Sequence, residues 1–389
     1  MTGYIPYGRQ TITDDDVAAV VATLRSDFLT TGPAVVQFED ACKQAFASPH
    51  AIALNSATSG LHVAYLALGL GEGDVLWTVP NTFLATANAA RLCGADVDFV
   101  DISSTTFNMC VTALEEKLRS AEKLPKIVAP VHFAGQPCDM KRIWELAEQY
   151  GFYVVEDAAH AVGATYKGEP VGNCRYSHMA VFSFHPVKIV TTAEGGLITT
   201  QDDELAAKCM KIRSHGMYKT PELSAAKGTW YYEMDTLGLN YRMTDIQAAL
   251  GTSQMTRLAP NIARRREIAA NYHTALKGLP YGCQRMNPEG VSSWHLFVIT
   301  CEDSAERRAL YDFFHQNEVG VQVHYIPVHT QPYYQELGFK KGDYPNAEAY
   351  YDRCLSIPMF HGLSDEQQDH VMSLLRSFQA EYGRQAKSA

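Results

Sequence analysis

Short apolar runs alternate with helix-like segments between residues 51 and 155. The apolar runs are continuous, without regularly interspersed polar residues, which is typical of strands covered on both faces. Strands that alternate with helices indicate a parallel sheet with helices packed against it. We expect strands at 51–54, 75–79, 97–100, 126–132 and 152–155, and helices at 59–68, 85–93, 112–121 and 140–150.

The alternation stops after residue 155. Two predicted strands, 180–184 and 196–200, are joined by a short loop that contains Lys188. Helical spacing of apolar residues predicts further helices at 11–26, 34–46, 203–213 and 244–258. We therefore predict one large α/β domain over residues 1–258, with an arm at 1–33 that contributes to the functional site.

A different mixture of elements follows residue 258. We expect helices at 261–276, 305–317 and 365–378, and strands at 294–300 and 319–325. Strands and helices that do not alternate regularly favour an α+β arrangement. Residues 259–389 are therefore predicted to form a second, smaller domain.

Charge, termini and cysteines restrict the class of protein. The 389 residues carry a formal net charge of -10, which argues against binding to nucleic acid. No apolar run reaches the length of about 18 residues that a membrane helix needs, and no signal peptide is evident at the start. The nine cysteines are irregularly spaced and odd in number, which favours free thiols in a reducing compartment. We predict a cytoplasmic protein that binds no membrane.

Two predicted strands are followed by ionisable groups. Asp157 lies two residues beyond the predicted end of the strand at 152–155, and Lys188 follows the strand at 180–184. Ligands bind at the carboxyl ends of strands in open α/β sheets. A lysine amine and a carboxylate at that edge match the needs of pyridoxal 5'-phosphate, PLP. Alternatively, Asp157 caps a turn and Lys188 is an ordinary surface residue.

Small residues lie between the first predicted strand and its helix. Residues 55–60 read Asn-Ser-Ala-Thr-Ser-Gly, and their backbone N–H groups could cradle a phosphate at the helix N-terminus. Taken alone, the same residues are also explained by an ordinary capped helix start.

Four segments together resemble a known family. The matching motifs, in order along the chain, lie at residues 55–60, 155–161, 182–196 and 238–247. Taken together they are similar to the sugar-nucleotide aminotransferases of the DegT/DnrJ/EryC1/StrS family. That resemblance implies the PLP-dependent transferase fold type I, aspartate-aminotransferase-like, with a mostly parallel seven-stranded sheet in the large domain.

The resemblance also implies roles for individual residues. Lys188 would bind PLP covalently and carry the catalytic proton, and Asp157 would face the ring nitrogen. The remaining cofactor contacts would come from Ala57 and Thr58 (phosphate, backbone), Ser183 (phosphate, hydroxyl), Phe83 (ring face), His160 (near the ring oxygen) and Asn240 (phosphate). Asn240 would reach the site from a partner subunit, so the active unit would be a homodimer.

The substrate is inferred from a narrower resemblance. Residues 5–10, 26–33 and 323–334 are similar to the pseudaminic-acid branch of the family, which aminates carbon 4 of a UDP-2-acetamido-2,6-dideoxy-4-keto-L-hexose with L-glutamate. The expected product is UDP-4-amino-4,6-dideoxy-N-acetyl-β-L-altrosamine, formed together with 2-oxoglutarate. The residues expected to line the sugar-nucleotide site are Tyr7, Asp27, Phe28, Leu29, Thr30, His185, His324, Tyr325, Ile326 and Pro327.

The residues alone leave several functions open. A dehydratase branch of the family has histidine in place of the lysine, and His185 lies nearby, but Lys188 is present and favours transamination. An aminotransferase for a different UDP-, dTDP- or GDP-linked keto sugar is compatible with the same motifs, and so is a non-catalytic sensor on the same fold. His324 and His329 could form a metal pair, but no third ligand is evident, so no metal site is predicted.

Overall fold

The computed structural model describes residues 3–386, and its centre is a seven-stranded sheet of order β1-β9-β8-β5-β4-β2-β3. β9 is antiparallel to both of its neighbours, and the other neighbouring pairs are parallel. The predicted mostly parallel seven-stranded sheet is therefore confirmed. Its strands are β1 (His50–Leu54), β2 (Val75–Thr78), β3 (Asp96–Phe99), β4 (Ile127–Val128), β5 (Tyr153–Asp157), β8 (Met179–Ser183) and β9 (Gly196–Thr200).

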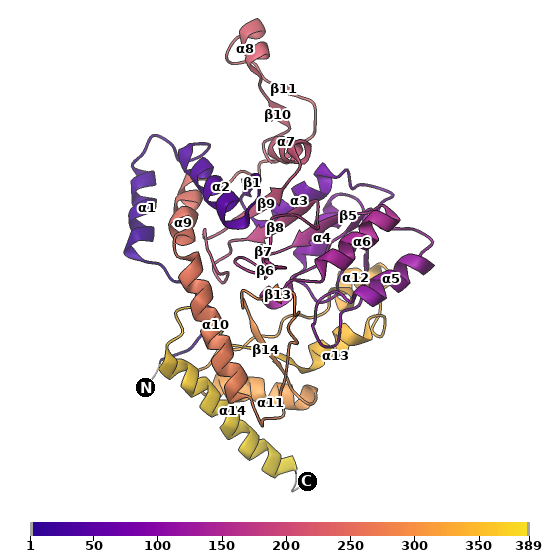
Figure 1. Ribbon diagram of the computed structural model, residues 1–389, viewed down its shortest axis with the longest axis vertical. Helices are drawn as coiled ribbons and strands as arrows, with labels where there is room; N and C mark the ends of the chain where they lie inside the picture. The colour runs from indigo at the N-terminus through magenta and orange to yellow at the C-terminus, as the bar shows by residue number, and fades with distance from the viewer. Residues whose placement is uncertain (1–2, 387–389) are drawn as a thin grey trace.

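Helices cover both faces of this sheet (Figure 1). Successive strand residues point to opposite faces, so Leu76 packs in one core while Val75 and Trp77 pack in another. One face is covered by α3 (Ala57–Ala67), α4 (Ala85–Leu92) and α7 (Asp203–Ile212). The other is covered by α5 (Val111–Ser120) and α6 (Met140–Tyr150) at one end, and by α2 (Pro33–Phe46) and α9 (Asp245–Met255) at the other.

The N-terminal segment is attached to α9. The helix α1 (Asp14–Leu24) packs on α9, and the buried Asp16 carboxylate pairs with Arg257 at 2.7 Å. Asp245, at the start of α9, accepts hydrogen bonds from the backbone N–H groups of Gly32 and Ala34. These contacts hold residues 25–34 against the large domain.

The long helix α10 (Leu258–Ala275) leads to the C-terminal elements (Figure 1). A three-stranded antiparallel sheet, β12-β14-β15, and a separate apolar core lie there. The elements are β12 (Gly282–Cys283), β13 (Gly290–Val291), β14 (Phe297–Thr300), α11 (Ser304–Gln316), α12 (Pro332–Glu336), α13 (Pro345–Arg353), β15 (Cys354–Ile357) and α14 (Asp365–Ala386). The domain boundary at residues 258 and 259 stays a prediction.

The prediction of a strand at residues 319–325 is wrong. Only two isolated bridges form there, Val319 with Ile5 and Gln322 with Ser356. Each bridge pairs with a different neighbour, so no continuous ladder develops. The segment then enters a short 3₁₀ turn, η2 (Val328–Thr330), after Pro327.

A hairpin arm projects from the body at the top of Figure 1. It consists of β10 (Met217–Tyr218), α8 (Pro221–Lys227) and β11 (Glu233–Met234). A second small sheet joins β13 to β6 (Thr165–Tyr166) and β7 (Glu169–Pro170), and η1 (Phe133–Gly135) follows β4. Over residues 3–386, no helix combines the length and the apolar character needed to cross a bilayer.

Candidate active site

The sheet brings the predicted catalytic segments to one edge. Asp157, the last residue of β5, pairs with Val181 of β8, and Ser183 at the end of β8 pairs with Gly196 of β9. Gly196 in turn pairs with Leu54, the last residue of β1. The start of α3, the end of β8 and the end of β5 therefore lie beside one another, and residues 184–195 connect β8 to β9 at the same edge.

Asp157 is held as a fixed carboxylate. Its side chain is buried, with one oxygen accepting a 2.6 Å hydrogen bond from Thr86 Oγ1 and the other a 3.1 Å bond from the Ala159 N–H. Thr86 Oγ1 also lies 2.9 Å from Thr82 Oγ1. The hydroxyl of Thr86 was not anticipated from the sequence, because no motif marks a residue that acts only through a distant carboxylate.

Lys188 has the environment of a nucleophilic amine. Burial lowers the pKa of Lys188 to about 8, although the negative charge of Asp157 acts in the opposite direction. Within residues 3–386, no hydrogen bond or ion pair engages its Nζ atom. A lysine with a depressed pKa has a substantial neutral fraction near neutral pH, and only the neutral amine attacks a carbonyl carbon.

The start of α3 is shaped for an anion. Ser56 is the N-cap and accepts a hydrogen bond from the Ser59 N–H at 3.1 Å, while Thr58 in the first turn is exposed. A Cβ on Gly196 would overlap the Ser56 carbonyl oxygen and lie 2.5 Å from the Ala57 nitrogen. Only glycine lets β9 approach the helix start this closely. Ser56 thus caps the helix in the usual way, and the first turn of the helix remains accessible to a ligand.

These groups fit PLP. The fixed carboxylate of Asp157, the amine of Lys188 and the accessible turn at Ala57 and Thr58 are the donor set that its ring nitrogen, aldehyde and phosphate require. The Phe83 side chain is 60% exposed although it belongs to a buried segment, so one face of the ring is available for stacking. When bound, the cofactor supplies an electron-withdrawing ring to the reacting carbon.

His160 and Tyr325 meet beside Lys188. His160 is buried, its Nδ1 atom lies 3.3 Å from the Ala134 nitrogen, and its Nε2 atom lies 3.1 Å from the Tyr325 hydroxyl. Burial, and then the positive charge of Lys188, hold the pKa of His160 well below its usual value, so the ring is neutral at pH 7. The pairing of His160 with Tyr325 could not be read from the sequence.

Part of the predicted sugar site is assembled around Tyr325. The ring of Tyr7 packs on the ring of His324 with centroids 5.6 Å apart. The ring centroids of Phe83 and Tyr325 are 6.3 Å apart. His324 is buried, with Nδ1 2.8 Å from Ser356 Oγ. Ile326 and His185 are exposed, and Pro327 is buried next to η2.

Two other predicted segments make no direct contact with Lys188 or Asp157 within the described residues. Asp27, Phe28, Leu29 and Thr30 occupy the loop between α1 and α2, where the Asp245 N–H donates to the Leu29 carbonyl. Asn240 is exposed and bridges to Ser214. Within the described chain, no hydrogen bond or ring contact links these residues to Lys188 or Asp157.

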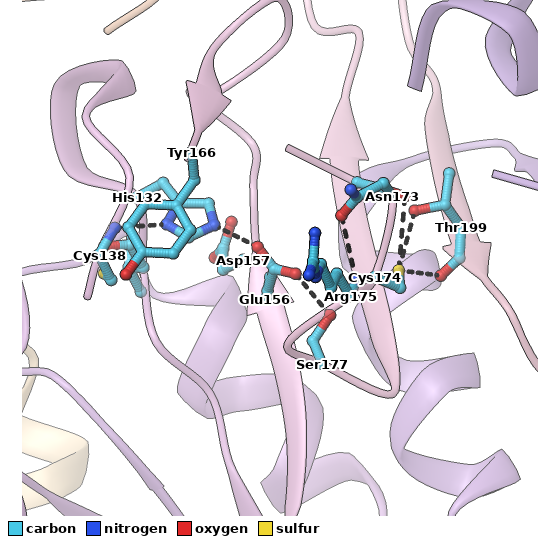
Figure 2. A network of polar contacts seen from close by, with 12 residues as sticks. His132, Cys138, Glu156, Asp157, Tyr166, Asn173, Cys174, Arg175, Ser177 and Thr199 are labelled. Atoms are coloured by element: carbon cyan, nitrogen blue, oxygen red, sulfur yellow. Dashed lines mark hydrogen bonds and ion pairs between the residues drawn. The ribbon is translucent and has the colours of Figure 1, made fainter. Parts of the chain in front are cut away.

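The opposite side of β5 carries a structural network (Figure 2). Glu156 accepts hydrogen bonds from His132 Nε2 at 2.6 Å and from Ser177 Oγ. The Cys138 N–H donates to His132 Nδ1 at 3.1 Å, which leaves the ring proton on Nε2. Glu156 thus ties β5 to neighbouring loops, on the face away from Asp157.

The histidines considered as metal ligands have other partners. His329 is buried and pairs with Glu348 at 2.9 Å, whereas His324 contacts Ser356. Throughout residues 3–386, no three His, Cys, Asp or Glu side chains are grouped so that they could hold a metal ion.

Known proteins share this chain's length and fold. The Bacillus subtilis spore coat polysaccharide biosynthesis protein SpsC is 39% identical over 383 residues, 96% of each chain. Spr1654 of Streptococcus pneumoniae, described as a sugar aminotransferase, superposes with a TM-score of 0.91 at 30% identity, over 97% of this chain and 99% of that one. Helicobacter pylori PseC, an aminotransferase involved in pseudoaminic acid biosynthesis, has a TM-score of 0.89 at 29% identity, over 96% and 99%.

The family comparison agrees with the site. Residues 10–376 match the DegT/DnrJ/EryC1/StrS aminotransferase family. Spr1654 has been solved in PLP and PMP forms, and sugar aminotransferases of this family depend on PLP, which confirms the cofactor and the enzyme class predicted from the sequence. The chain therefore belongs to the DegT/DnrJ/EryC1/StrS aminotransferase family.

Proposed function

We propose that this aminotransferase moves the amino group of L-glutamate to carbon 4 of a UDP-2-acetamido-2,6-dideoxy-4-keto-L-hexose. The products would be UDP-4-amino-4,6-dideoxy-N-acetyl-β-L-altrosamine and 2-oxoglutarate, in the cytoplasm. The likeness of residues 5–10, 26–33 and 323–334 to the pseudaminic-acid branch supports this substrate, and so does the similarity to PseC. The observation that carries the reaction type is the unpaired, desolvated amine of Lys188 beside the fixed carboxylate of Asp157, within the described residues 3–386.

Different residues of the chain would carry out proton transfer, hold the cofactor ring and bind the phosphate. Lys188 would accept the proton from the carbon of L-glutamate that loses nitrogen and would deliver a proton to the sugar carbon that gains nitrogen, since its pKa of about 8 allows both charge states near neutral pH. Asp157, fixed by Thr86 and the Ala159 N–H, keeps its negative charge directed at the ring nitrogen. The first turn of α3 and Ser183 hold the phosphate at the other end.

A homodimer with a shared site is part of the proposal. The hairpin arm and the residues just after it expose large apolar side chains: Trp230 in the arm is 79% accessible, and Leu237, three residues after β11, is 82% accessible. Exposed apolar groups on a projecting hairpin favour contact with another protein surface. Asn240 follows the arm, so an arm packed against a second copy would carry Asn240 toward that copy's site. The predicted division into domains at residues 258 and 259 belongs to the same proposal.

Incubation with L-glutamate and the UDP-4-keto sugar, followed by NMR of the product, tests the function. We expect a new amine at carbon 4, and no product from Lys188→Ala. The wild-type protein should also show a visible absorption band that borohydride removes. Product only from a dTDP- or GDP-linked keto sugar would replace the proposed substrate. Loss of a hydroxyl without gain of nitrogen would indicate a dehydratase, and no turnover of any keto sugar would indicate a sensor.

A further inference from the structure

The direction of the hydrogen bonds around Tyr325 can be assigned. The Ala134 backbone N–H donates to His160 Nδ1 at 3.3 Å, so Nδ1 holds a lone pair and no proton. A neutral imidazole then carries its single proton on Nε2. His160 Nε2–H therefore donates to the Tyr325 hydroxyl 3.1 Å away.

This assignment leaves the Tyr325 proton free. The phenol oxygen accepts from His160, so its own hydrogen must be donated elsewhere. Burial raises the pKa of Tyr325, and the negative charge of Asp157 adds to that effect, so the phenol stays protonated at neutral pH. The Ala134 N–H thus fixes the orientation of the His160 proton, and the His160 proton in turn makes the Tyr325 hydroxyl a donor to a further group.

The surroundings hold this pair in place. The Tyr325 backbone N–H donates to Asn81 Oδ1 at 3.2 Å, and its ring packs near Phe133 at 6.3 Å. His160 is held by two further residues. Ser293 Oγ donates to the His160 backbone carbonyl at 2.8 Å, and the His295 ring packs on the imidazole with centroids 4.3 Å apart. Both partners are therefore fixed by residues outside the pair.

The pair lies near the predicted catalytic residues. His160 lies three residues after Asp157, and the Tyr325 backbone N–H is bonded to Asn81, in the same segment as Thr86, which donates to Asp157. The positive charge of Lys188 also contributes to the low pKa of His160, and the negative charge of Asp157 to the raised pKa of Tyr325. Phe83, with its exposed ring, is a further neighbour of Tyr325. A free donor therefore lies among the residues predicted to contact the cofactor and the sugar.

We propose that Tyr325 donates to the oxygen of the keto substrate and assists its departure as water; this rests on the proposed function. As the carbon–nitrogen bond forms, the carbon–oxygen bond breaks. Both hydrogens of the released water come from the amino group that replaces the oxygen, so Tyr325 lends a proton and regains it. The same donor acts in reverse when 2-oxoglutarate gains its keto oxygen from water.

NMR of the protein with ¹⁵N-labelled histidine tests the hydrogen-bond direction without any turnover. We expect His160 to show a protonated Nε2 and an unprotonated Nδ1 at pH 7, assigned by comparison with His160→Gln. A proton on Nδ1, or on both nitrogens, would overturn the proposal, because Tyr325 would then have no fixed direction.

Kinetics of Tyr325→Phe test the catalytic role. The substitution keeps the ring but removes the hydroxyl, and general acid assistance is worth about 10²-fold or more in rate. We expect kcat to fall about 10²-fold in the L-glutamate half-reaction and with the sugar, with little change in KM. Tyr311→Phe, in α11 and packed at a tilt against His315, is the matched control and should keep the wild-type rate.

Cofactor content and thermal unfolding of Tyr325→Phe should match the wild type, which separates lost chemistry from lost folding. A wild-type rate in Tyr325→Phe would overturn the proposal. If the wild-type protein reacts with L-glutamate but not with the UDP-4-keto sugar, the proposed substrate fails, whereas the comparison of Tyr325→Phe on L-glutamate still decides the role of the hydroxyl.

Discussion

Thr86 donates its hydroxyl proton to Asp157 across 2.6 Å, inside a buried site. Because that proton is committed to the carboxylate, the contact between Thr82 and Thr86 at 2.9 Å is satisfied by the Thr82 proton. Two threonines four residues apart therefore form a chain of donors that ends on the carboxylate expected to face the ring nitrogen.

Replacing Thr86 with valine should weaken PLP binding. The substitution keeps the shape but removes a hydrogen bond to a charged group, worth about 1.5–3 kcal/mol, or roughly a tenfold to hundredfold change in Kd. Thr86→Ser should restore most of the affinity. Equilibrium dialysis of PLP against the three proteins measures this, and equal Kd values for valine and threonine would refute the role.

Replacing Gly196 with alanine should disturb the phosphate end of the site. The new Cβ would overlap the Ser56 oxygen and meet the Ala57 nitrogen at 2.5 Å, and both atoms belong to the backbone. Overpacking of this kind costs about 1–3 kcal/mol in unfolding free energy. Urea denaturation measures the loss, and PLP affinity should fall in parallel. Gly71→Ala, whose nearest contact is 3.9 Å away, is the control and should change neither quantity.

The stability of the cofactor-free protein should rise with pH between about 8 and 10.5. The folded protein releases the Lys188 proton near pH 8 because burial disfavours the charge, whereas the unfolded chain holds it until about 10.5. The unfolded state thus binds more protons in this window, so raising the pH favours folding. Lys188→Met should be more stable at pH 7 by on the order of 1–3 kcal/mol and should lack this rise. Urea midpoints at pH 7, 9 and 10.5 show the difference, and parallel curves would contradict it.

Mixing two defective variants should restore activity if the site is shared. Lys188→Ala lacks the amine but keeps Asn240, and Asn240→Ala keeps the amine. A dimer of one chain of each variant then contains one complete site. If every dimer is mixed, co-expression should recover up to about half of the activity of the wild-type dimer. Trp230→Ser combined with Leu237→Ser should weaken self-association in sedimentation velocity. Failure of complementation, with a dimer still present, would place Asn240 in the site of its own subunit.

The sequence was sufficient for the central sheet and for its catalytic edge. Continuous apolar runs predicted every strand of that sheet, because burial on both faces leaves little room for polar residues. Asp157 and Lys188 were likewise visible as charged groups at strand ends. In contrast, residues 319–325 alternate like a strand but form only two bridges, since each bridge pairs with a different partner.

Other features depend on contacts between distant residues. The hairpin arm was missed because its strands are two residues long and its helix buries no residue. Thr86 meets Asp157 across 71 positions, and Tyr325 meets His160 across 165. Neither pair has a local pattern, so only the folded chain reveals them.

The reversal of β9 has a consequence for engineering this enzyme. A crossover helix after β8 would carry the chain away from the sheet edge, whereas the direct return into β9 anchors both ends of the Lys188 loop within the sheet. The loop at residues 184–195 therefore cannot be lengthened or shortened without moving one of these two strands. Segments outside it, at Tyr7 and at 324–327, are attached through other elements. A designer who seeks a new sugar can vary Tyr7, His324, Ile326 and Pro327, while Tyr325 and the Lys188 loop are kept.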